Sequence, residues 1–236
     1  MVSFKWAHFA KDMILICVRW SVAYPLSYRQ LEELMQERGI SVDHSTIHRW
    51  VLKYSPLLAE VFHRRKRPVS CSWRMDETYI RVKGQWKDLY RAVDKSGPTL
   101  DFLLTEHRDE RAALRFLTTA IRRHDVPHVI TIDRSRAHAA AITTYNTAHK
   151  AMIAIRQVRD LNNVVEQHHR AVKRVVRPLL GFKSMETALR TLAGIEVMHM
   201  IKKGQMVTQE GPQGQTPAQQ FYSLAAEFRR PQASPR

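Results

Sequence analysis

The sequence predicts an α/β fold in which a five-stranded mixed sheet with flanking helices is preceded by an N-terminal helical helix-turn-helix domain. Three observations lead to this fold class. The first seventy residues carry helical patterns separated by turn signals. After Pro68 the composition changes, and short segments rich in β-branched and aromatic residues follow one another. Further along the chain, helical and strand patterns alternate, which is typical of strands joined through helices.

Composition favours a polyanionic partner. The chain has 236 residues, of which 44% are apolar, enough for a core or for two small domains. Its 38 Lys and Arg residues outnumber 22 Asp and Glu residues, which gives a formal net charge of +16. Such a balance favours nucleic acid, with an anionic membrane surface as the alternative. The first residues lack the pattern of a secretory signal, and no apolar run approaches the roughly 18 to 20 residues that span a bilayer.

Cysteine usage predicts a reducing compartment. Cys17 and Cys71 are the only cysteines and lie in unrelated contexts. Neither a disulfide scaffold nor a thiolate zinc site is therefore expected. We expect a cytoplasmic protein.

Three helices are predicted in the first domain, which we place at residues 1–56. The first covers residues 12–22. The second follows Ser27, which is placed for a capping box with Gln30, and it ends at Gly39. The third covers residues 44–54 after an Asp43 cap. Two helices joined by a short Gly-containing turn give helix-turn-helix geometry, with an ordinary three-helix bundle as the alternative.

The outward side of the third predicted helix is polar or basic, as base edges and phosphates require. The DNA-binding candidates on it are Ser45, Thr46, His48, Arg49 and Lys53. A predicted basic linker, residues 57–70, then carries four consecutive cations: Arg64, Arg65, Lys66 and Arg67. This run suits a tether along a DNA backbone or a merely solvated linker.

The next segment predicts an antiparallel meander followed by a parallel strand. Strands are expected at residues 73–82, 86–93 and 100–105, with Lys83-Gly84 as the first turn. A helix at 109–124 leads to the short apolar run 129–132, which suits a strand buried on both faces. A right-handed crossover places this fourth strand beside the first. Asp76 in the first strand and Asp133 after the fourth would then lie within a few ångströms, and a divalent cation would neutralise them.

A helix at 135–148 and a fifth strand at 152–155 are expected before an amphipathic helix that begins near Asp160 and ends at Pro178. Its polar face carries one carboxylate, Glu166, among the cations Arg170, Lys173, Arg174 and Arg177. This pattern suits a metal-binding acid beside a phosphate-binding face. The alternatives are local: a salt-bridged solvated face for Glu166, pairing with Arg74 for Asp76, and a helix cap for Asp133.

The C-terminal part is predicted to hold a long helix at 185–205, which is either core or a subunit contact. Together with the preceding segment it closes a catalytic domain that we place at residues 71–205. Residues 206–236 are rich in Gln, Pro and Gly and are expected to form a tail. The alternative is that its one apolar island, residues 221–226, docks.

Several segments occur in the order found in one known family: Val42–Ile47, Trp73–Ile80, Leu161–Asn163, Glu166–Gln167, His169–Arg174, Gly181–Ser184 and Thr191–Glu196. On these segments the chain resembles the IS6 family of bacterial insertion-sequence transposases. The resemblance implies an RNase H-like DDE core in which Asp76, Asp133 and Glu166 are the catalytic and metal-binding acids. It also identifies Lys173, seven positions after Glu166, with a basic position of the family.

The resemblance further implies a Mg²⁺-dependent enzyme with two ions, for which Mn²⁺ can substitute. Such an enzyme cleaves DNA at the terminal inverted repeats of its element and joins the ends to target DNA, giving replicative transposition with cointegrate formation. It works as a homodimer or higher oligomer, without a membrane partner, in the bacterial cytoplasm at the nucleoid. Two alternatives remain open: a helix-turn-helix DNA-binding protein or inactive relic that does not cut, and a plain nuclease that does not join.

Overall fold

The computed structural model describes residues 4, 8–133, 135–158, 163–208 and 214–226. The chain divides into two compact units. One, the helical unit, comprises Met1–Lys66 together with Arg190–Arg236, and the other, the sheet unit, comprises Arg67–Leu189. No helix among the described residues is both long enough and apolar enough to cross a membrane.

The sheet unit contains five strands in the order β3-β2-β1-β4-β5. Strands β1 (Ser72–Val82), β2 (Gln85–Asp94) and β3 (Thr99–Thr105) form the antiparallel meander that the sequence predicts. Strand β4 (Val129–Ile132) pairs in parallel with β1, and β5 (Ala154–Gln157) pairs in parallel with β4. The predicted mixed five-stranded, RNase H-like sheet is confirmed, although β5 begins two residues later than expected.

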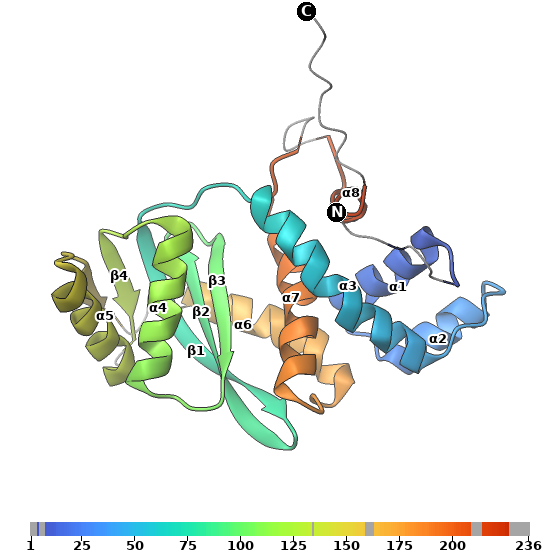
Figure 1. The fold of residues 1–236 in the computed structure, drawn as a ribbon, viewed down its shortest axis with the longest axis horizontal. Helices are drawn as coiled ribbons and strands as arrows, with labels where there is room; N and C mark the ends of the chain where they lie inside the picture. Colours follow the sequence, from blue (N-terminus) through green and yellow to red (C-terminus); the bar gives the residue numbers. More distant parts are fainter. Residues whose placement is uncertain (1–3, 5–7, 134, 159–162, 209–213, 227–236) are drawn as a thin grey trace, which may run out of the picture. The chain divides into compact units, whose positions relative to one another are not determined.

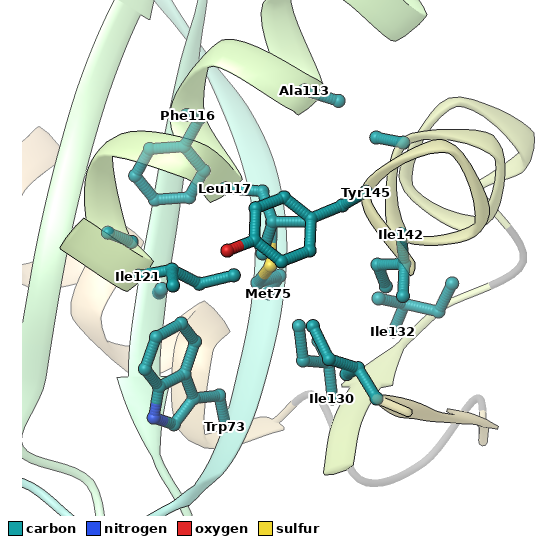
Figure 2. Close-up of a cluster of buried hydrophobic side chains, with 14 of the residues drawn as sticks. Trp73, Met75, Ala113, Phe116, Leu117, Ile121, Ile130, Ile132, Ile142 and Tyr145 are labelled. Carbon is teal, nitrogen blue, oxygen red and sulfur yellow. The ribbon is translucent and has the colours of Figure 1, made fainter. Parts of the chain in front are cut away.

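Helices cover the two faces of this sheet (Figure 1). Helices α4 (Glu110–His124) and α5 (Arg136–His149) pack on one face, where strand residues such as Trp73, Met75 and Ile130 meet Phe116 and Tyr145 in a continuous apolar core (Figure 2). Side chains alternate along β1, so Asp76 points away from this core toward the face that carries α6 (Asn163–Val176). The alternation therefore decides on which face a catalytic acid of β1 can stand.

Helix α6 has the amphipathic character that the sequence predicts. Val165, Val172 and Val176 are buried. Its regular turns end at Val176, and the residues Arg177–Leu179 form a 3₁₀ turn that contains Pro178. Residues 161 and 162, where the predicted stripe and polar face begin, lie outside the described part of the chain.

The helical unit begins with α1 (Lys11–Ala23), α2 (Tyr28–Gln36) and α3 (His44–Arg64). The expected capping box is present, because Ser27 Oγ accepts from Gln30 N and Gln30 Oε1 accepts from Ser27 N. Helix α3 is longer than predicted, since it continues through Pro56 to Arg64. The expectation of a linker over residues 57–70 was therefore wrong up to Arg64. Leu58, Ala59 and Phe62 are buried, and this apolar face sustains the extra turns.

The C-terminal segment completes the helical unit. Helix α7 (Met185–Lys202) is largely buried, and its residues from Arg190 onward belong to this unit. Helix α8 (Pro217–Ser223) buries Phe221, and Leu224 and Ala225 beyond it are buried too. Within residues 206–236 the structure thus supports docking of the apolar island, and the expectation of a tail was wrong for this part.

Candidate active site

Asp76 lies in the middle of β1, the central strand of the sheet. Its cross-strand partner on β2 is Arg91, a fully buried cation. The Asp76 side chain is 19% exposed, so it is desolvated on most sides but still open to solvent. This is a position from which a carboxylate can reach a ligand that arrives from outside the sheet.

Asp133 directly follows β4, the strand that pairs in parallel with β1. Its Oδ1 atom accepts a hydrogen bond from the Ser135 backbone N–H at 2.8 Å. This bond holds the turn between β4 and α5. It is not the helix cap considered for Asp133, because the N-cap residue of α5 is Ser135 and α5 has no side-chain cap hydrogen bond. The contact engages only one of the two carboxylate oxygens, and carboxylates have acceptor capacity beyond a single bond.

Glu166 lies in the first turn of α6, on the polar side of the helix. Its side chain is 53% exposed, and its Oε1 atom is 2.7 Å from Arg170 Nη2, one helical turn later. The salt-bridged solvated face considered from the sequence is therefore present as well. An exposed pair of this kind contributes little to stability, so Glu166 can change partner at small cost.

Asp76 lies close enough to Asp133 and Glu166 for their charges to act on its carboxylate. The pKa of Asp76 is raised to about 6, chiefly by burial and to a smaller extent by the carboxylates of Asp133 and Glu166, while a backbone hydrogen bond from Glu77 and the charge of Arg108 oppose the rise. The three side chains do not form a ready-made metal cluster, because no group of three or more metal-ligating side chains is found among the described residues. They are close enough to repel one another but are not closed around a common point.

The histidine beside Asp76 does not relieve this repulsion. His169 Nε2 lies 3.7 Å from Asp76 Oδ2. Burial, followed by the charges of Arg91 and Lys173, lowers the pKa of His169 to about 3, so the ring is neutral at physiological pH. Asp76 and the neighbouring carboxylates supply oxygen donors, which suit a hard divalent cation such as Mg²⁺. The neutral imidazole of His169 adds no positive charge that would compete with such a cation.

A second acid next to Asp76 was missed from the sequence. Glu77 points to the opposite face of β1, its side chain is 5% exposed, and it forms an ion pair with Arg108. Its Oε2 atom lies 3.3 Å from His138 Nε2 on α5, without hydrogen-bond geometry. Burial raises the pKa of Glu77 to about 7, while Arg108 opposes this. Strand alternation could have separated Glu77 from Asp76, but nothing local indicated its partners on the β3–α4 loop and on α5.

The residues predicted to read DNA lie on the exposed side of α3, with partners of their own. Ser45 and Thr46 hydroxyls donate to the carboxylate of Asp43, which caps the helix. Arg49 donates to Thr46 Oγ1 at 2.8 Å. His48 packs beside Tyr28, and Lys53 lies over the ring of Tyr54. The first turn of α3 is thus a connected polar cluster rather than a row of independent side chains.

The basic run after α3 is less free than expected. Arg64 pairs with Glu60 one turn earlier, and Arg65 Nη1 donates to Ser223 Oγ at 3.2 Å. Lys66 forms an isolated antiparallel bridge with Met206. Arg67 is half-buried. On α6, by contrast, Lys173, Arg174 and Arg177 are exposed, and none forms an ion pair with a described residue.

Comparisons with known proteins give matches to a domain family and to transposases. A family model described as a DDE domain matches residues 70–205. The chain is 37% identical over 201 residues to the transposase for insertion sequence-like element IS431mec of Staphylococcus aureus, covering 85% of this chain and 88% of that protein. It is 36% identical, over the same shares, to the transposase for insertion sequence element IS257 in transposon Tn4003 of Staphylococcus aureus.

Among solved structures, the HTLV-2 integrase catalytic core domain in complex with magnesium is a distant neighbour. It is 17% identical, with a TM-score of 0.47, and the match covers 66% of this chain and 99% of that one.

Proposed function

Because the chain belongs to the IS6 family of DDE transposases, we propose that Asp76, Asp133 and Glu166 are its catalytic acids and that they act on the ends of an insertion sequence. The observation that carries this proposal is placement: Asp76 lies on β1, Asp133 directly follows the parallel neighbour β4, and Asp76 faces α6, which carries Glu166. A divalent cation bound between these acids of β1, the end of β4 and α6 would relieve their mutual repulsion.

The three acids would together hold two Mg²⁺ ions, with Mn²⁺ as a substitute. Bound there, the ions supply Lewis-acid stabilisation of the negative charge that develops on the phosphate during displacement. Asp76 is presented by a strand and Asp133 by the end of its parallel neighbour, so both are positioned by the sheet. Glu166 is presented by α6 and would turn from Arg170 toward the other two acids.

The proposed chemistry is phosphoryl transfer in two steps. Water attacks a phosphodiester at the element end, the P–O3′ bond breaks, and the products are a 3′-hydroxyl and a 5′-phosphate. This 3′-hydroxyl then attacks a target phosphodiester, so a new P–O bond forms while the target strand loses its own P–O3′ bond. The same site would serve both steps, and the expected product is a cointegrate.

DNA binding would involve two basic surfaces. The exposed side of α3 would contact the terminal inverted repeats, with the first-turn cluster around Asp43 holding Arg49 in place. Lys173 and Arg174 on α6, and Arg177 in the 3₁₀ turn after it, would contact phosphates next to the catalytic acids, because they follow Glu166 along the same segment of the chain. Two ends must be brought together, so we expect a homodimer or larger assembly.

The first prediction concerns the acids. Purified protein and a duplex carrying the element ends are expected to give nicked and joined products with Mg²⁺ or Mn²⁺ and none with EDTA. Asp76→Asn, Asp133→Asn and Glu166→Gln are each expected to lower the rate by a factor on the order of 10² to 10³ or more, because charge stabilisation is lost at the phosphate. End binding, measured by mobility shift, should remain.

Asp125→Asn is the matched control, because Asp125 is an exposed residue just after α4 with a positive φ that asparagine tolerates. It should cleave and join like the wild type. Binding of the ends without any nicking would favour the non-catalytic DNA-binding protein instead. Cleaved ends that never join a target would favour a nuclease.

A further inference from the structure

The hairpin between β1 and β2 extends beyond the rest of the sheet (Figure 1). Strand β3 ends opposite Asp88, and β4 pairs only with Ser72–Arg74, so the outer residues of β1 and β2 have no other strand beside them. The tip turns through Lys83 and Gly84, both with positive φ. Such a turn matches the twist of paired strands, so the tip is a regular hairpin end.

The chain after α6 holds this hairpin in place. The Lys83 backbone N–H donates to the Phe182 carbonyl at 2.7 Å, and the Phe182 N–H donates to the Arg81 carbonyl at 3.0 Å. Phe182 itself is only 8% exposed. The edge of β1 near the tip is therefore fixed by the chain around Phe182, while one face of the hairpin remains exposed to solvent.

Two aromatic rings lie on the open side. Trp86 is 67% exposed and Tyr79 is 44% exposed. Trp86 stands directly across from Arg81, and Tyr79 lies two residues before Arg81, so alternation puts all three side chains on one face. An indole supplies a large apolar face together with a polar N–H, which is why tryptophan is enriched at contact surfaces, and here a second exposed ring lies on the same face.

The charge of the hairpin is of one sign. Residues 81–87 contain three cations, Arg81, Lys83 and Lys87, and no acid. None of the three forms an ion pair with a described residue, and Arg81 Nε only approaches the Gly84 carbonyl at 3.4 Å. Aromatic faces interleaved with unpaired cations match a polyanion that carries flat bases. A protein partner fits less well, because lysines are depleted in protein interfaces.

We propose that this hairpin, residues 79–87, is a DNA-contacting surface in which Trp86 stacks on an unpaired base while Arg81, on the same face, and Lys83, in the turn, contact the phosphates. The proposal rests on the proposed function, since it takes the ligand to be the DNA on which the enzyme acts. It adds a binding surface on the sheet unit that is separate from α3 and α6.

The place of the hairpin decides what it can do in the reaction. Arg81 lies five residues beyond Asp76 on the same strand, about 17 Å away. That separation corresponds to about five nucleotides at roughly 3.4 Å each. Alternation puts Asp76 and Trp86 on opposite faces, so Trp86 would hold DNA that flanks the reacting phosphate and would not touch the phosphate itself. Its loss should weaken binding without slowing the chemical step.

The test measures DNA affinity of the full chain by fluorescence anisotropy, with a labelled single strand and with the same sequence as a duplex. Trp86→Ala is expected to weaken single-strand binding roughly 5- to 150-fold, the range for loss of one stacked base, and to affect the duplex much less. Trp86→Phe keeps a ring and should retain most of the affinity. Because Trp86 is largely exposed, both variants should unfold at the wild-type temperature.

Salt dependence separates the cations from the ring. Lys83→Gln should reduce the slope of log affinity against log salt by about 0.7, whereas Trp86→Ala should leave the slope unchanged. Lys95→Gln is the matched control, because Lys95 is an exposed lysine at the opposite end of β2. Lys95→Gln should change neither the DNA affinity nor the slope of log affinity against log salt if the contact is specific to the hairpin.

Three results would overturn the proposal. The first is Trp86→Ala binding both DNA forms as tightly as the wild type, and the second is Lys95→Gln reducing the slope as much as Lys83→Gln. A change of oligomeric state in Trp86→Ala, seen by light scattering, would instead assign the surface to a second copy of the chain. Binding is measured without cleavage, so a wild type that binds but never cuts would refute the proposed function and leave the hairpin result standing.

Discussion

Asp43 shows how one side chain can both begin a helix and hold the groups that surround it. Its carboxylate accepts from the backbone N–H groups of Ser45 and Thr46 and from both of their hydroxyls. Arg49 is tied to the same cluster through Thr46. The geometry of the predicted DNA-reading turn therefore depends on a residue that would not itself contact a base.

We expect Asp43→Ala to lower the thermal unfolding temperature at pH 7, followed by circular dichroism. Hydrogen bonds from Ser45 and then Thr46 hold the pKa of Asp43 below its ordinary value. The stabilisation is thus present above the unfolded pKa of about 3.9 and is lost as pH falls toward the folded pKa. The difference between variant and wild type should shrink below about pH 4. A difference that stays constant down to pH 2 would contradict a role for the charge.

Single residues also show which parts of the candidate site the sequence does not predict. Asp76 and Asp133 are predicted as a pair because a strand acid and a strand-end acid fall on adjacent strands, and the structure confirms that β1 and β4 are neighbours. His169 was not assigned a place beside Asp76, because a polar residue in the apolar stripe of α6 gives no sign of what it meets across the sheet. Glu77 was missed for the same reason, since its partners come from distant segments.

At the scale of the element, α7 meets α3 at unusually close range. A Cβ at Gly194 would lie 2.5 Å from Ser55 Oγ and 2.8 Å from Val22 Cγ1. No real Cβ sits at such distances, so glycine is required for the helices to pack as they do. A long apolar helix was predicted there, but the need for a glycine at the crossing depends on tertiary packing alone.

Gly194→Ala is expected to reduce the free energy of unfolding by about 1 to 2 kcal/mol in urea denaturation. Overpacking costs about 1 to 3 kcal/mol, and the better helix propensity of alanine recovers up to about 1 kcal/mol. Adding Ser55→Ala should restore part of the loss, because the Oγ contact goes while the Val22 contact stays. Full stability of Gly194→Ala alone would show that the two helices do not approach so closely.

Elements with a strong periodic signal were predicted to within a residue or two. The meander, β4, α4 and α5 are examples, because each combines a clear pattern with a turn or cap. Helix α8 is not predicted from the sequence, which offers only docking of the island 221–226 as an alternative, although Thr216 and Gln219 form a capping box that the sequence displays. A seven-residue helix has too few apolar positions for its burial to be read from its pattern.

At the scale of the molecule, the two ends of the chain build one unit. The first 66 residues and those from Arg190 onward are grouped together, while the sheet unit lies between them in the sequence. Val207 N donates to the Arg65 carbonyl, and Arg19 Nε donates to Tyr222 Oη. The boundaries expected from the sequence, with residues 1–56 as a separate domain, remain a prediction, since the family model itself spans 70–205.

We expect residues 1–66 alone to fold poorly, because Phe221, Leu224 and the buried side of α7 would be missing from their core. A fusion of residues 1–66 to residues 185–226 through a flexible linker should recover cooperative thermal unfolding and dispersed amide resonances. An isolated fragment 1–66 with a fully dispersed spectrum would contradict this.

Phe221→Ala tests, in the full chain, whether the C-terminal segment belongs to the core of the helical unit. Truncating a buried phenylalanine costs about 3 to 5 kcal/mol, and this loss should appear as lower resistance of the helical unit to urea. Val207→Ala is the control, since Val207 is 52% exposed and should lose little. Equal effects of both changes would place Phe221 outside the core.

Because both ends of the chain build the helical unit, the DNA recognition proposed for α3 would depend on completed synthesis. On the ribosome the first three helices emerge early, but the segments that cover their apolar faces are made last. A premature stop or frameshift within the sheet unit would release a product without a finished helical unit. Such defective copies of the gene are then expected to be poor competitors for the element ends, so intact enzyme would not be inhibited by its own truncated relatives.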